Sequence, residues 1–102
     1  MKIIECISEL IEDEIEDAEH YVDLAVKWKE DYPDTADLMY DLSTEEMGHM
    51  AKLHEEVVAL IQDYKDKNGE PPQEMMFVYN YLHKRQIDKA AKVRSKQEMY
   101  KA

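Results

Sequence analysis

Apolar residues recur every three or four positions over long stretches of the chain, which is the spacing of amphipathic α-helices. We predict helices over about residues 2 to 31, 35 to 67 and 72 to 100. The apolar stripe of the first helix is Ile7, Leu10, Ile11, Ile15, Ala18, Tyr21, Val22 and Ala25. That of the second is Met39, Leu42, Met50, Leu53, Val57, Leu60, Ile61 and Tyr64.

Two short breaks separate the predicted helices. In the first break, Pro33 is expected to stop one helix, and Asp34 or Thr35 to cap the next by accepting a backbone hydrogen bond. In the second, Gly69 can take the left-handed backbone that ends a helix, and two prolines follow it. Because the first connection is short, residues 1 to 70 are predicted to form a long antiparallel helical hairpin.

Residues 71 to 102 are predicted to form a third helix that begins apolar and becomes basic in its C-terminal half. We expect its first half to pack, whereas its second half could extend along a partner or fray. Asp88 and Glu98 are the acids among residues 75 to 102, and the cations there are Lys84, Arg85, Lys89, Lys92, Arg94, Lys96 and Lys101. The acidic remainder of the chain, or of a second copy, is the expected counter-charge, and an external anionic partner is the alternative.

The composition agrees with an all-α protein, because charged residues make up 36% of the chain and glycine occurs twice in 102 residues. A single domain of this size leaves much of its surface exposed, which favours a homo-oligomer, at least a dimer. The net charge of -11 disfavours nucleic acid as a partner. With one cysteine, Cys6, no secretory signal and no membrane-spanning run, we expect a cytoplasmic protein without a membrane partner.

Three polar side chains fall inside the apolar stripes at about 100° per residue: Glu14 on the first helix, and Glu46 and His49 on the second. The hairpin places Glu14 and Glu46 at a similar height, so the three side chains can meet. Burying a carboxylate costs several kcal/mol unless it is compensated. Glu46 and His49 lie one turn apart on one face and can bind a single metal ion, and oxygen and imidazole ligands favour iron or manganese.

An alternative without metal remains open. Glu14 and His49 could form an ordinary ion pair at a hydrated seam, with Glu46 on an open face. Glu19 is the next choice for a ligand on the first helix, and His54 is a weaker one at the edge of the second stripe. His20, Glu45 and His83 are expected at the surface.

The arrangement of Glu14, Tyr21 and the Glu46-x-x-His49 motif resembles the ferritin-like superfamily, especially rubrerythrins and half-length encapsulated ferritins. The resemblance covers about residues 7 to 64. It implies that a two-fold dimer completes a four-helix bundle and brings Glu14, Glu46 and His49 of both chains around two iron ions at the interface. Manganese is the other metal that fits.

The resemblance further implies that Tyr21 is a hydrogen bonder or redox neighbour of the ligands. Two activities of the family stay open, ferrous iron oxidation as a ferroxidase and rubrerythrin-like reduction of peroxide. The chain has no Cys-x-x-Cys segment for electron delivery, and no recognisable targeting tail supports an encapsulating shell. A metal-free helical oligomerisation or adaptor module is the alternative function.

Overall fold

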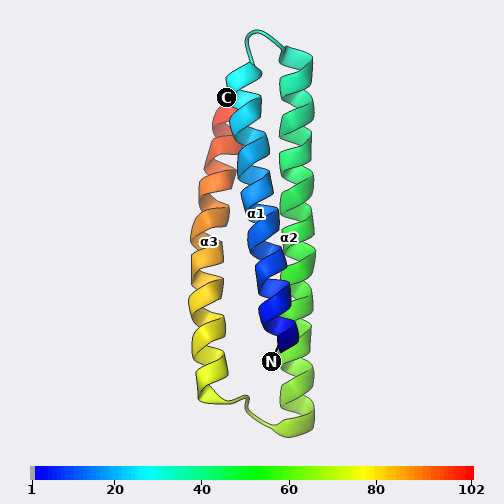
Figure 1. Ribbon diagram of the computed structural model, residues 1–102, viewed down its shortest axis with the longest axis vertical. Coiled ribbons are helices and arrows are strands. Elements are labelled where there is room, and N and C mark those ends of the chain that lie inside the picture. Colours follow the sequence, from blue (N-terminus) through cyan, green and yellow to red (C-terminus); the bar gives the residue numbers. More distant parts are fainter. Residues whose placement is uncertain (1) are drawn as a thin grey trace.

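The computed structural model describes residues 2–102, which form three helices and no strand (Figure 1). They are α1 (Lys2–Trp28), α2 (Pro33–Asn68) and α3 (Gln73–Lys101). The predicted all-α class and the three segments are thus confirmed. None of these helices is both long and apolar enough to cross a lipid bilayer.

The two breaks differ in how closely they follow the prediction. α1 ends at Trp28, and Pro33 opens α2 after Tyr32 at the cap position, so the predicted cap by Asp34 or Thr35 was wrong. Proline suits a first helical turn, where its missing N–H would have no partner in any case. Gly69 ends α2 with a positive φ of +80°, as predicted, but its ψ of -163° is extended and not left-handed helical; its N–H donates to the Lys65 carbonyl at 2.9 Å.

The molecule is a rod of 56 × 20 × 17 Å in which α1 packs against both other helices (Figure 1). α1 and α2 form the predicted antiparallel hairpin, and α3 lies beside α1 and runs in the same direction as α1 (Figure 1). Residues from all three helices build one main core. It consists of Ile4, Ile11, Ile15, Ala18, Met47, Met50, Val57, Ile61, Ala90 and Val93.

The two halves of α3 pack differently from the prediction. The N-terminal half leaves Phe77 and Tyr81 exposed, whereas the C-terminal half buries Ala90, Val93 and Tyr100. The first half therefore packs only in part, through Met76 and Tyr79, which contact the core. The second half, which was expected either to extend along a partner or to fray, packs against α1 of the same chain.

The basic half of α3 docks on the acidic flank of α1, as the charge pattern predicted. Lys96 Nζ lies 2.9 Å from Asp23 Oδ1 and 3.6 Å from Glu19 Oε2. Arg85 Nε lies 3.7 Å from Glu12 Oε1. Exposed ion pairs of this kind contribute about 1 kcal/mol or less each, so they orient α3 more than they hold it.

The end of α3 is fixed by a polar anchor around Tyr100. Its hydroxyl donates to Asp37 Oδ1 at 2.5 Å, its carbonyl accepts from Lys29 Nζ at 2.5 Å, and its ring stacks on Tyr40. Burial, and then the hydrogen bond to Asp37, raise the pKa of Tyr100 from 10.0 to about 12. The turn that follows α1 and the start of α2 are thereby tied to the end of α3.

Candidate metal centre

Glu14 on α1 and Glu46 and His49 on α2 come together, as predicted from the wheel. His49 Nδ1 lies 3.6 Å from Glu14 Oε2 and 3.8 Å from Glu46 Oε2. One ligand atom from each residue lies within 4.8 Å of the others. The cluster thus offers two carboxylates and one imidazole on the surface formed jointly by α1 and α2, which we call the α1–α2 face.

A buried polar bridge fixes the register of the two helices beside this cluster. The Ser43 hydroxyl donates to the Ala18 carbonyl at 2.6 Å and accepts from Gln97 Nε2 at 2.9 Å. Ser43 lies one turn before Glu46, and Ala18 lies one turn after Glu14. The bridge therefore joins the helical turns next to the ligands, and it ties α3 to the same point.

The three side chains differ in exposure. Glu46 is 19% and Glu14 26% exposed, but His49 is 55% exposed. The expectation that His49, inside the apolar stripe, turns away from solvent was wrong for a single chain, because it lies at the outer edge of the α1–α2 face, where no helix within residues 2–102 covers it. Glu14 Oε2 is nevertheless inaccessible to solvent and lacks a hydrogen bond. A buried acceptor without a hydrogen bond lowers the free energy of unfolding, that is, it destabilises the fold.

The donor set fits a divalent cation such as Fe²⁺ or Mn²⁺. Oxygen and imidazole ligands without thiolate suit these metals. With bonds of about 2.1 Å, two ligand atoms on one ion lie roughly 3 Å apart. The observed 3.6 and 3.8 Å separations need only small side-chain rotations to reach that value. A cation between the three groups would also give Glu14 Oε2 a partner.

The other residues singled out from the sequence lie away from this cluster. Tyr21 is half-buried on the same flank of α1, but it follows Glu14 by seven residues, or about 10 Å along the axis. Within the described chain no hydrogen bond joins it to the ligands, so its role stays a prediction. Glu19 binds Lys92 and Lys96 on the opposite flank, and Glu45 and His20 are exposed as expected.

A second group, at the seam between α2 and α3, was missed by sequence reasoning. His54 stacks on His83 with ring centroids 4.6 Å apart, and Tyr79 stacks on the other side of His83 at 5.5 Å. Burial, and then the neighbouring His54, lower the pKa of His83. His83 is thus half-buried, not at the surface as predicted. Because α3 has little apolar periodicity, its sequence gave no signal for this placement.

Comparison with known proteins adds no further constraint on this centre. No family model, curated protein or solved structure matches the chain.

Proposed function

We propose that this chain is a ferritin-like di-iron carboxylate protein in which two copies share one metal centre. Each copy contributes Glu14, Glu46 and His49, and the activity is oxidation of ferrous iron or the handling of oxygen or peroxide. The observation that carries the proposal is the convergence of these three side chains on a half-covered face, with Glu14 Oε2 buried and without a hydrogen-bond partner.

The α1–α2 face supports a partner on physical grounds. Apolar side chains flank the ligands on this face and stay partly exposed: Ile7, Leu10, Tyr21, Leu42, Leu53 and Leu60. A second hairpin packed here across a two-fold axis would cover them and His49 together. It would also double the ligand set to the four carboxylates and two histidines that a two-metal site in a four-helix bundle uses.

The residues of the centre have distinct tasks in this proposal. The carboxylates of Glu14 and Glu46 supply hard oxygen ligands and offset the charge of the cations, and neutral His49 supplies nitrogen. Bound iron would supply the one-electron chemistry with oxygen or peroxide. Partial burial of Glu14 and Glu46, together with the cover that the second copy would place over His49, would exclude most bulk water from the centre. Because the ligands must be deprotonated, metal affinity falls on acidification.

Metal content separates this function from a metal-free module. Protein prepared with ferrous iron is expected to hold about one iron per chain by elemental analysis, since a two-metal site is shared by two chains. Glu46→Ala should lose most of that iron, and the matched control Glu45→Ala, at the adjacent exposed carboxylate, should keep it. Full loading of Glu46→Ala would contradict the assignment.

Redox activity needs its own measurement. Mixing the loaded protein with air and following the ferric absorbance should show faster oxidation than with Glu46→Ala at equal iron. Equal rates would leave metal binding without a ferroxidase role. Native mass with and without iron tests whether two chains share the ions.

The second candidate is a metal-free helical oligomerisation module. The 3.6 Å approach of His49 to Glu14 favours it, because an ordinary ion pair has this geometry. In that case Glu46→Ala and wild type have the same low iron content.

A further inference from the structure

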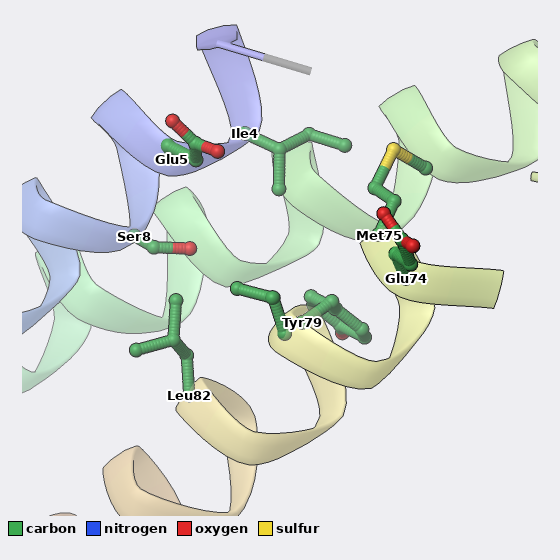
Figure 2. Close-up of a pocket in the computed structure, with 8 residues that line it drawn as sticks. Ile4, Glu5, Ser8, Glu74, Met75, Tyr79 and Leu82 are labelled. Atoms are coloured by element: carbon green, nitrogen blue, oxygen red, sulfur yellow. The ribbon is translucent and has the colours of Figure 1, made fainter. Parts of the chain in front are cut away.

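The outward face of the first half of α3 is apolar and uncovered. Phe77 is 74% and Tyr81 is 61% exposed, and they lie one turn apart on the same side of the helix. The opposite side of this half faces α1: Tyr79 and Leu82 line a hollow of about 230 Å³ together with Ile4 (Figure 2). α3 is therefore already seated on α1 here, and Phe77 and Tyr81 point away from that contact.

Two opposite charges flank this apolar pair. Glu74 lies three residues before Phe77, and Lys84 lies three residues after Tyr81. At about 100° per residue all four side chains fall within an arc of roughly 80°. Glu74 and Lys84 are both exposed, and neither forms an ion pair within residues 2–102. Glu74 lies at one edge of this arc and also borders the hollow against α1 (Figure 2). The face thus reads acid, aromatic, aromatic, base along one line.

Two copies of this face match in charge only when their helices run antiparallel. If two such helices cross antiparallel near residue 79, Phe77 meets Tyr81 of the second copy and Glu74 meets Lys84 of the second copy. A parallel arrangement would instead set Glu74 against Glu74 and Lys84 against Lys84, which is repulsive. Packed helices diverge away from their crossing point, so the contact is confined to about residues 74 to 84. Asp88 and Glu70, which the same register would oppose, lie outside it.

We propose that this face, Glu74, Phe77, Tyr81 and Lys84, binds the same face of a second copy in an antiparallel, two-fold contact. It lies on α3, away from the α1–α2 face, so it does not depend on the metal centre. Its area is small, as expected for a weak contact. Where a copy also pairs through its α1–α2 face, the two different two-fold contacts link chains into assemblies larger than a dimer.

Metal-free sedimentation equilibrium over a wide range of concentration tests the contact. Phe77→Asp should lower the mean mass at each concentration where wild type associates. Glu74→Lys and Lys84→Glu should each raise the dissociation constant about tenfold, since both symmetric pairs become repulsive. The double reversal Glu74→Lys/Lys84→Glu should restore the wild-type value. Lys27→Glu/Glu30→Lys, exposed charges near the other end of the rod, is the matched control and should change nothing.

Cross-linking tests the antiparallel register in a Cys6→Ser background. A mixture of Phe77→Cys and Tyr81→Cys chains should form disulfide-linked pairs faster than either variant alone. Faster linking of Phe77→Cys to itself would indicate a parallel contact and overturn the proposal.

Three other outcomes would also overturn it: a wild type that stays monomeric, a Phe77→Asp variant that associates like wild type, and charge reversals that are not rescued by each other. Binding of the wild type, but not of Phe77→Asp, to vesicles would assign the face to lipid instead. Loss of iron from Glu46→Ala leaves all of these results unchanged, so the two proposals fail separately.

Discussion

Removing the Ser43 hydroxyl should weaken both the fold and the candidate metal centre. Ser43 is completely buried, and its oxygen donates one hydrogen bond to Ala18 and accepts another from Gln97. A buried hydrogen bond contributes about 1 kcal/mol net, and a donor left without a partner costs a similar amount. Ser43→Ala breaks both bonds and orphans the Gln97 amide, so we expect a loss of about 2 kcal/mol.

For a chain of this size, that loss corresponds to a fall in Tm of roughly 10 °C. Urea unfolding followed by circular dichroism measures it at one fixed protein concentration, since association shifts the apparent stability. Thr44→Ala is the matched control. The Thr44 hydroxyl also donates to a backbone carbonyl, that of Asp41 at 2.8 Å, but it is exposed. Its loss should stay within about 0.5 kcal/mol.

A double-mutant cycle identifies the bridge as the cause. Gln97→Met removes the amide that Ser43→Ala orphans, so the double variant should be more stable than the sum of the single changes predicts, by about 1 kcal/mol. Iron affinity should fall in Ser43→Ala and not in Thr44→Ala, because the bridge holds the turns next to Glu14 and Glu46 in register. A Ser43→Ala protein as stable as wild type would refute the reasoning.

Three further predictions concern α3. Val93→Ala empties a fully buried position between α3 and α1, and urea unfolding should show a loss of about 2 kcal/mol from the missing methyl groups and the cavity. The pKa of Tyr100 is raised from 10.0 to about 12 in the fold. The contribution of its neutral hydroxyl to the free energy of unfolding is therefore complete below pH 10 and is lost as the pH rises through about 12. Tyr100→Phe should lack that alkaline slope in thermal melts. The lowered pKa of His83 has the opposite effect on the pH dependence of stability. The free energy of unfolding is highest above about pH 6.5 and falls on acidification, because the unfolded chain binds the proton more readily than the folded chain does. His83→Phe should therefore show a flatter dependence of the urea midpoint across that range.

The hairpin and the similar position of Glu14 and Glu46 along it could be predicted from the sequence, because both depend only on where the helices break and on the spacing of residues within each helix. Pro33 and Gly69 interrupt the helical pattern, and a wheel gives the direction of each side chain on its own helix. That was sufficient to bring Glu14, Glu46 and His49 together. A wheel does not show whether another element covers a given direction, so it could not give the 55% exposure of His49.

α3 could not be predicted in the same way, because its contacts depend on distant partners. Its small buried residues, Ala90 and Val93, make a weak pattern, and its largest apolar residue, Phe77, points outward. The bridge through Ser43 was hidden for a related reason. A serine among apolar neighbours gives no sign of its partners, and here they lie 25 and 54 positions away in the chain.

The central place of α1 makes it the shared support of the rod. α2 contacts one flank of it and the basic half of α3 another, while α2 and α3 make few backbone contacts with each other. A substitution on α1 is therefore transmitted to both seams at once, whereas the outer surfaces of α2 and α3 can change sequence independently. Amide exchange should be slowest in the middle of α1 and fastest in the first half of α3, so that the rod opens from one end while the helical turns bearing the ligands stay closed.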